Sequence, residues 1–404
     1  MMKKMIIVIL ACLLIFLLGC RGRDIDIPDP NDEKNSEHVE KPDEIAEKIK
    51  SMTIEEKIGQ LVMIGIEGEK VDENIKEMIE NRHAGGIILF SGNIKSADQT
   101  LELLNNLKDL NRGNIPLFLG LDEEGGRVTR LSKEFVKIPS MQEVGNEDDK
   151  DYSFRIGEAL GMRVKSLGFN IDFAPVMDIN SNYKNPVIGD RSFGDNPEIV
   201  IEQGTQVMNG IKSTGVISVV KHFPGHGDTR VDSHKKLPIV DKTFEEIDNF
   251  ELLPFKKSIE EGVDGIMVAH ILFPKIDGEN PASFSYTVIN DILREKLNYK
   301  GVIITDDMTM GAVMNNYDIG EASVKSLKAG SDIILVCHGY ENEHKVLDTI
   351  KEAVESGDIK EEDIDKKLYR ILKLKEKYVN DERINEVNIE DINRKTRDIL
   401  SYDR

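Results

Sequence analysis

The chain has few cysteines and no excess of positive charge. Its 404 residues include three cysteines, and its formal net charge is −21 at pH 7. This negative charge argues against binding to the phosphates of nucleic acid, so we expect no nucleic-acid partner. It also argues against a broad electrostatic attraction to anionic lipid, so any membrane attachment must come from another feature of the chain.

The apolar run near the start of the chain is too short to span a membrane. Residues 5–18 are apolar, whereas a spanning helix needs roughly 20 such residues. Positively charged residues 3–4 precede the run, and the sequence LLGC (17–20) follows it, as in a bacterial lipoprotein signal peptide with its lipobox. We therefore expect residues 1–20 to be this signal and Cys20 to be the lipidated residue. An ordinary signal peptide with a chance cysteine is the alternative.

The remaining cysteines and the next segment fit the same interpretation. Removal of the signal peptide takes away Cys12, and Cys20 carries lipid, so no disulfide can form within one mature chain. Cys337 ends the apolar run IILVC and is predicted to lie in the core. Residues 21–45 are rich in charged residues, Asn and Pro, which is typical of a disordered tether. We expect a protein that is exported and lipid-anchored to the outer face of the bacterial cell membrane.

Short apolar runs alternate with longer amphipathic stretches along most of the chain. Runs that are apolar throughout are typical of parallel strands covered on both faces by helices. Eight such units predict an α/β fold, a (β/α)₈ TIM-type barrel, as a single catalytic domain over residues 46–380, with a charged C-terminal extension over 381–404. A doubly wound open sheet is the alternative, but no dinucleotide-type glycine fingerprint follows the first run. The predicted strands cover 61–66, 85–90, 116–122, 171–178, 216–223, 265–273, 301–307 and 332–338, and predicted helices cover 98–111, 153–167, 197–213, 244–261, 286–297, 320–329, 343–355 and 361–378.

Polar and charged residues gather where the predicted strands end. The stretch 221–238 follows the fifth strand and contains three of the eight histidines. The carboxyl ends of barrel strands form one rim, where catalytic residues of this fold lie, so we expect one site there. For any single residue, a structural ion pair is the alternative. The strand-end residues are Asp122 to Arg127 with Arg130, Asp178, Asp190 and Arg191, Lys221 and His222, His270, and Asp306 and Asp307.

The residue types on this rim favour sugar chemistry over two alternatives. His222 and His226 have the spacing of a helical zinc pair, but Pro224 and Gly225 lie between them, so we expect no metal site. Ser233 lacks the strained Gly-x-Ser-x-Gly turn of a serine hydrolase. Glycoside cleavage needs a carboxylate and a proton donor, which this rim supplies without a cofactor.

Six segments of the chain contain the strand-end residues named above. They are DEEGGRVTRL (122–131), FAPVMDI (173–179), GDRSFG (189–194), KHFPGHGDTRVDSH (221–234), MVAHILFP (267–274) and GVIITDDMTMGAV (301–313). In these segments the chain resembles the bacterial β-N-acetylglucosaminidases of glycoside hydrolase family 3. They span nearly the whole predicted barrel, in the order typical of the family. The loop KHFPGHG followed by Asp-Ser-His is the most specific of them.

The resemblance implies roles for individual residues. Asp306 is similar to the family's nucleophile, and His234 to its general acid/base, with Asp232 orienting the ring. The chemistry agrees, because a histidine exchanges protons near neutral pH without help from burial. Asp307 is the alternative nucleophile, but in a strand it points the opposite way from its neighbour. The residues implied to hold the sugar are Asp122, Arg130, Arg191, Lys221 and His222.

The resemblance also implies the reaction. We expect a retaining β-N-acetylglucosaminidase, acting as a monomer on terminal β-linked N-acetylglucosamine of peptidoglycan fragments or related oligosaccharides. A β-glucosidase-like specificity and a sugar-binding lipoprotein without catalysis are the alternatives. Unlike some Gram-positive relatives, this chain resembles the single-domain form. The aglycone, the choice between water and phosphate, and the roles of His226, Asp228 and the C-terminal tail stay open.

Overall fold

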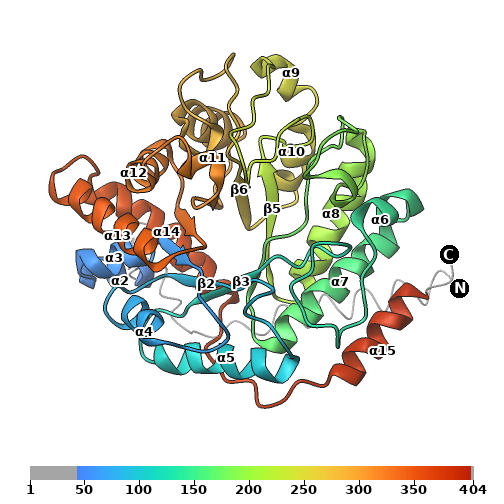
Figure 1. Cartoon of the computed structure of the whole chain (residues 1–404), viewed down its shortest axis with the longest axis horizontal. Coiled ribbons are helices and arrows are strands. Elements are labelled where there is room, and N and C mark those ends of the chain that lie inside the picture. The colour runs from blue at the N-terminus through green and yellow to red at the C-terminus, as the bar shows by residue number, and fades with distance from the viewer. Residues whose placement is uncertain (1–42, 402–404) are drawn as a thin grey trace, which may run out of the picture. The chain divides into compact units, whose positions relative to one another are not determined.

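Eight parallel strands form a closed barrel in sequence order in the computed structural model, which describes residues 43–401. Helices surround this barrel (Figure 1). The predicted (β/α)₈ fold is therefore confirmed. The strands are β1 (Val62–Ile64), β2 (Gly86–Ile88), β3 (Phe118–Leu121), β4 (Ile171–Asp172), β5 (Ile217–Phe223), β6 (Gly265–Val268), β7 (Val302–Asp307) and β8 (Ile333–Val336).

The predicted helices are present, with two differences. The segment 244–261 forms two helices, and Pro254 stands in the first turn of the second, where its missing N–H costs no helical hydrogen bond. The segment 286–297 forms a π-helix. The helices are α2 (Glu44–Ser51), α3 (Ile54–Gly59), α4 (Glu73–Glu80), α5 (Ala97–Leu110), α6 (Met141–Glu147), α7 (Lys150–Leu167), α8 (Pro197–Ser213), α9 (Phe244–Asp248), α10 (Leu253–Glu260), η3 (Thr287–Lys296), α11 (Gly311–Met314), α12 (Ile319–Ala329), α13 (Tyr340–Glu355), α14 (Glu361–Tyr378) and α15 (Ile389–Leu400), with short 3₁₀ turns η1 (Gly189–Arg191) and η2 (Ala282–Phe284).

β4 is much shorter than the predicted strand 171–178 and pairs through only two residues on each side. Pro175 follows it and has no backbone N–H to donate to a neighbouring strand. The chain returns to the barrel wall at Val176, which forms a single bridge with Lys221 of β5. Asp178 therefore lies beside β5 instead of ending a regular strand.

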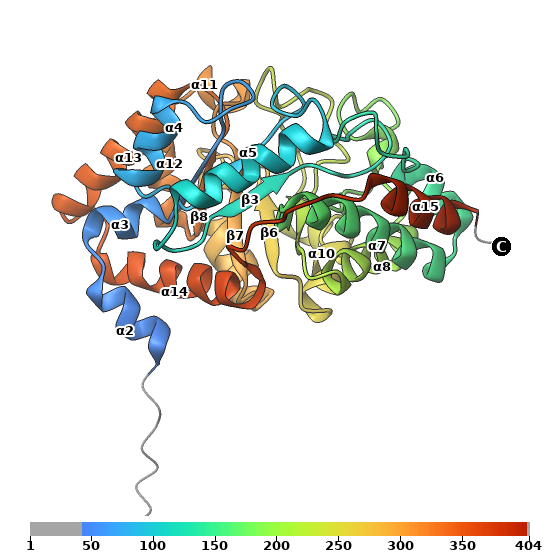
Figure 2. The same ribbon diagram turned by 90° about the horizontal axis from the view of Figure 1, so that it is seen from below.

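The amino end of the barrel is covered by α14, which packs against α2 (Figure 2). From α14 the buried Lys375 amine reaches inward and donates to the Gln60 side chain at 2.8 Å and to the Gly85 carbonyl at 2.7 Å. Burial lowers the pKa of Lys375 to about 7. These contacts fill the centre of the barrel at its amino end, whereas the carboxyl ends of the strands lie at the opposite end.

The two ends of the chain refine the predicted boundaries. Helix α2 begins at Glu44, so the predicted tether end at residue 45 is slightly too late. Cys20 and residues 21–42 lie outside the described residues. No helix within residues 43–401 is long and apolar enough to cross a membrane.

The predicted C-terminal extension contains helix α15, which packs against α7. The Asn393 side chain fastens it, because it donates to the Glu134 carbonyl at 2.7 Å and accepts from the Val136 N–H at 2.8 Å. The barrel, α2 and α15 thus form one packed unit. Within this unit Cys337 is buried, as predicted.

Candidate active site

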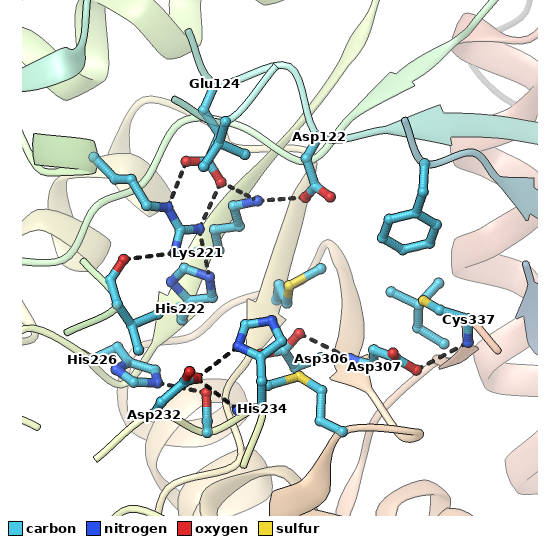
Figure 3. Close-up of a pocket in the computed structure, with 18 of the residues that line it drawn as sticks. Asp122, Glu124, Lys221, His222, His226, Asp232, His234, Asp306, Asp307 and Cys337 are labelled. Atoms are coloured by element: carbon cyan, nitrogen blue, oxygen red, sulfur yellow. Dashed lines mark hydrogen bonds and ion pairs between the residues drawn. The ribbon is translucent and has the colours of Figure 1, made fainter. Parts of the chain in front are cut away.

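A cavity of about 350 Å³ opens at the carboxyl end of the barrel (Figure 3). All eight residues predicted to bind or transform a sugar line it, although they come from segments that are far apart in the sequence. The structure therefore brings the predicted set together. The eight residues are Asp122, Arg130, Arg191, Lys221, His222, Asp232, His234 and Asp306.

A chain of alternating charges forms one wall of the cavity. The Lys221 amine lies 2.6 Å from an oxygen of Asp122 and 2.6 Å from an oxygen of Glu124. Arg130 donates to the other oxygen of Asp122 at 2.9 Å. Arg191 donates to both oxygens of Glu124, at 2.7 and 2.8 Å. Burial would raise the pKa of each carboxyl group, but the cations outweigh burial and hold both pKa values below the usual range.

Glu124 is a site residue to which the sequence analysis assigned no role. The sequence feature that could have indicated its role is its position two residues after Asp122, because alternate residues of an extended segment point the same way. Glu123, between them, points into the protein instead and lies 3.0 Å from the buried Arg163 guanidinium. Of the three consecutive carboxylates, two therefore serve the cavity and one serves the core.

His222 is held by a carboxylate that the sequence analysis placed on the rim without a partner. Its Nδ1 lies 2.6 Å from Asp178, and because a carboxylate only accepts, Nδ1 carries the proton. Its Nε2 then accepts from Arg191 at 3.4 Å. Burial would raise the pKa of Asp178, but His222 beside it lowers that pKa overall. The ring is thus fixed in one tautomer and one orientation.

His226 braces the loop that follows β5. Its Nδ1 lies 2.8 Å from the Thr229 hydroxyl, its Nε2 lies 3.0 Å from the Ser233 hydroxyl, and its backbone N–H donates to Asp178 at 2.6 Å. Burial lowers the pKa of His226 to about 4, so the ring is neutral at pH 7. With both ring nitrogens occupied, His226 shapes the loop and has no free nitrogen for a substrate.

The pair Asp232 and His234 lies on this same loop. One Asp232 oxygen accepts from the His234 backbone N–H at 2.9 Å and lies 2.9 Å from His234 Nδ1. Burial would raise the pKa of Asp232, but these hydrogen bonds lower it overall. The carboxylate therefore holds the proton on Nδ1 and leaves Nε2 for exchange. The His234 side chain is 65% exposed, and Figure 3 shows it beside Asp306.

Asp306 and Asp307, at the end of β7, have different surroundings. The Asp307 carboxylate accepts from the Thr309 hydroxyl at 2.6 Å and from the Cys337 N–H at 3.0 Å. Within residues 43–401 the Asp306 carboxylate has one donor, the Asp307 N–H at 2.9 Å. Burial would raise the pKa of Asp306, but the nearby His270 and other imidazoles outweigh burial and lower it. Asp306 is therefore an ionised carboxylate with an oxygen left for the cavity.

His270 contacts the backbone at the end of β7. It lies two residues after the end of β6 and is buried. Its Nε2 lies 3.0 Å from the Asp307 carbonyl oxygen, and its Nδ1 lies 2.7 Å from the Ser283 hydroxyl. Because the carbonyl only accepts, Nε2 carries the proton. His270 thus fixes the backbone that carries Asp306 and does not line the cavity.

The cavity combines the parts that glycosidic cleavage needs. It offers an ionised carboxylate, an imidazole whose outer nitrogen is open, and a charged wall that suits hydroxyl groups. Within residues 43–401, no group of three or more His, Cys, Asp or Glu side chains has the arrangement of a metal site. The carboxylate and the imidazole supply a nucleophile and an acid–base group.

Comparison with known proteins agrees with this geometry. Residues 53–374 match the glycosyl hydrolase family 3 N terminal domain. Beta-hexosaminidase A of Pseudoalteromonas piscicida is 35% identical over 328 residues, 75% of this chain but only 55% of that protein. A beta-hexosaminidase of Nitrosomonas eutropha is 34% identical over 296 residues, 72% of this chain and 84% of that protein.

The solved structures include a similar protein. The glycoside hydrolase family 3 beta-N-acetylglucosaminidase of Paenibacillus sp. str. FPU-7 superposes with a TM-score of 0.82 at 38% identity, over 86% of this chain and 68% of that one. The family domain covers the whole barrel, from the capping residue of α3 into α14. The chain is therefore a member of glycoside hydrolase family 3.

Proposed function

We propose that this protein is a retaining β-N-acetylglucosaminidase that removes terminal β-linked N-acetylglucosamine from peptidoglycan fragments or related oligosaccharides. One observation carries the proposal: the Asp306 carboxylate and the imidazole of the Asp232–His234 pair line the same cavity beside the charged wall. The beta-hexosaminidase names of its relatives support the substrate class.

In the first step Asp306 attacks the anomeric carbon. The bond to the leaving oxygen breaks, and His234 Nε2 gives that oxygen a proton, so a glycosyl-enzyme forms on Asp306. Asp232 supports this transfer by position, because its contact with Nδ1 holds the ring in one tautomer and one orientation.

In the second step the same imidazole works in reverse. His234 Nε2, now without its proton, takes a proton from water, and the oxygen of that water attacks the anomeric carbon. The bond to Asp306 breaks and the carboxylate is restored. Two displacements at one carbon return the β configuration, so the sugar is released with retention.

The charged wall positions the sugar for both steps. Carboxylate oxygens of Asp122 accept from hydroxyl groups, and Arg130 and Lys221 donate to them. Because these groups already neutralise one another, a neutral sugar can enter without stranding a buried charge. The fixed ring of His222 adds a further directional contact. Such preorganisation places the anomeric carbon against Asp306.

A substrate panel tests the assignment. We expect p-nitrophenyl β-N-acetylglucosaminide to be hydrolysed with much higher kcat/KM than the β-glucoside and β-galactoside, and with retention seen by NMR. Preference for the β-glucoside would contradict the specificity. Formation of a sugar phosphate in phosphate buffer would show that phosphate replaces water. No turnover of any glycoside would support a binding protein instead.

The cellular setting belongs to the same proposal. The signal sequence ending at Cys20 supports export and lipid anchoring at the outer face of the membrane, with residues 21–43 as the tether. There the enzyme would meet cell-wall fragments directly. We also propose that the single barrel acts as a monomer, which sedimentation of the purified protein tests.

A further inference from the structure

A second cleft, of about 730 Å³, lies at the opposite end of the barrel from the active site. It is lined by the segments that enter β7 and β8, by η3, and by the start of α14. Seven of its lining residues are Lys or Arg and three are Asp or Glu. In a chain with a formal charge of −21, such a local excess of positive charge is unusual. We call it the basic cleft.

The acidic side chains of the basic cleft do not neutralise all its cations. Lys328 is paired with Asp358, and Lys366 lies 2.8 Å from Asp363. The third acidic residue, Glu295, forms no ion pair with a described residue. Lys300 and Lys360, at the rim, also form none within residues 43–401. Unpaired cations therefore remain in the cleft.

Beneath the surface, the fully buried Asp332 sets the position of two arginines. Arg370 donates to one of its oxygens through Nε at 2.9 Å and Nη2 at 2.7 Å, and Arg294 donates to the other oxygen. One carboxylate thus supports two guanidinium groups, and the pair of arginines keeps one net positive charge. These hydrogen bonds hold the two guanidinium groups in fixed positions beside the cleft.

Lys367 is the residue that points to a ligand. It lines the basic cleft and is only 6% exposed, yet its amine forms no hydrogen bond or ion pair with any residue of the described part of the chain. The carboxylates of Asp332 and Asp363 lie near enough to favour its charged form but do not pair with it, and proteins normally give a buried ammonium group a direct anionic partner. Lys373 lies on the same helix but is exposed and outside the cleft, so it serves as a surface lysine for comparison.

We propose that the basic cleft binds a phosphate-bearing ligand, with Lys367 at its base, Arg370 at its side and Lys300 and Lys360 at its rim. Lysine and arginine groups converging on one cavity are how proteins grip phosphate oxygens. The ligand is a soluble phosphorylated molecule or the headgroup of an anionic phospholipid. The overall negative charge argues against a broad attraction to lipid, whereas the basic cleft is a local excess of positive charge.

The experiment titrates the purified full-length protein in two arms. In the first, glycerol 3-phosphate and inorganic phosphate are titrated by calorimetry. In the second, vesicles of phosphatidylglycerol in phosphatidylcholine are compared with phosphatidylcholine alone, using the Cys20→Ala protein so that lipidation does not contribute. Binding in the first arm alone assigns a soluble ligand, and binding to the anionic vesicles alone assigns a headgroup.

Variants separate the cleft from general charge. Lys367→Gln should weaken binding by about tenfold or more, as expected for the loss of a charged hydrogen bond. Lys360→Gln, at the exposed rim, should weaken it less and cannot disturb the core. Lys373→Gln makes the same charge change on the same helix and should leave binding unchanged. All three should keep wild-type glycosidase activity, because the cleft lies away from the active site.

Sulfate provides a further readout, because it keeps its charge across neutral pH. Burial lowers the pKa of Lys367 to about 8, so the amine loses its proton as the pH rises from 7 to 9. The groups around it, Asp332, Asp363, Arg294 and Arg370, are of classes that do not titrate in this range. Sulfate affinity should therefore fall over this range in the wild type and stay flat in Lys367→Gln. No binding in either arm, or equal loss in Lys367→Gln and Lys373→Gln, would overturn the proposal.

Discussion

The backbone N–H of Gly311 donates to the carbonyl of His234 at 3.1 Å. The next residue, Ala312, donates to the Ser233 carbonyl at 3.0 Å. A Cβ atom at position 311 would lie 2.6 Å from the His234 oxygen, so this approach requires glycine. The loop that carries the proposed acid/base and the turn after the proposed nucleophile, Asp306, are therefore joined backbone to backbone.

Gly311→Ala tests this contact. The added methyl group should push the His234 loop outward and lower kcat by about 10²-fold, because a displacement of about 1 Å can cost that much. KM should change less, since the charged wall is untouched. Gly92→Ala is the matched control, because a Cβ there meets no atom within 4 Å. If both variants keep wild-type kcat, the contact does not position His234.

Asp306→Asn and Asp307→Asn should distinguish the proposed nucleophile from the neighbouring carboxylate that has a structural role. Asp306→Asn should lower kcat by about 10⁴-fold or more while sugar binding persists, as for loss of a nucleophile. Asp307→Asn should keep much more activity but lose about 1–3 kcal/mol of stability, since its carboxylate accepts from Thr309 and Cys337. Mass spectrometry after labelling with a fluoro-sugar identifies the nucleophile. A label on Asp307 would reverse the assignment.

His234→Gly should distinguish the two chemical steps. Loss of the acid/base should cost about 10² to 10⁴ in rate on a substrate with a poor leaving group, and much less in the first step with an acidic phenol. Azide needs no base, so it should rescue turnover of the activated substrate and give a β-glycosyl azide. Asp232→Ala should act in the same direction but more mildly. Uniform loss across leaving groups, without azide rescue, would leave His234 a binding residue.

Glu343 on α13 predicts a pH dependence of stability. It is 1% exposed, its Oε2 has no hydrogen-bond partner among residues 43–401, and burial with nearby Glu67 and Asp72 raises its pKa to about 8. The folded protein therefore holds a proton that the unfolded chain releases near its ordinary pKa of 4.5. The stabilisation is complete below that value and is lost as the pH rises toward 8.

Glu343→Gln should remove this slope. Relative to the variant, the wild type should lose about 1–3 kcal/mol of unfolding free energy between pH 5 and pH 8, as expected for an unsatisfied buried group. Denaturant unfolding at several pH values measures the difference. Glu341→Gln, on the exposed side of the same helix, is the control and should follow the wild type. Parallel curves for all three proteins would place the Glu343 pKa near normal.

Cys20→Ala tests the anchor. The variant should be absent from the membrane fraction, because a lipoprotein is attached through more than one acyl chain on its cysteine and the variant has no cysteine to carry them. Its kcat should be unchanged. Fractionation followed by an activity assay measures both quantities. Retention of the variant in the membrane fraction would show that Cys20 is not the anchor.

The sequence alone determined the barrel and most of the active-site residues. Apolar runs of the right length, repeated with amphipathic stretches, are a local pattern, and a parallel barrel places all strand ends on one rim. Asp306, His222 and Lys221 could therefore be assigned to one site from their position at strand ends. Their motifs supplied the roles that the resemblance implied.

Only the tertiary structure decided which partners these residues have. Asp178 holds His222 from 44 positions away, and Glu124 joins Arg191 from 67 positions away, so no local pattern connects them. The glycine contact at the His234 loop also depends on distances between distant segments, as does the position of Lys367, which has no ion pair within residues 43–401. Periodicity follows from the backbone of one segment, whereas hydrogen bonds, burial and charge pairing depend on which segments meet when the barrel closes.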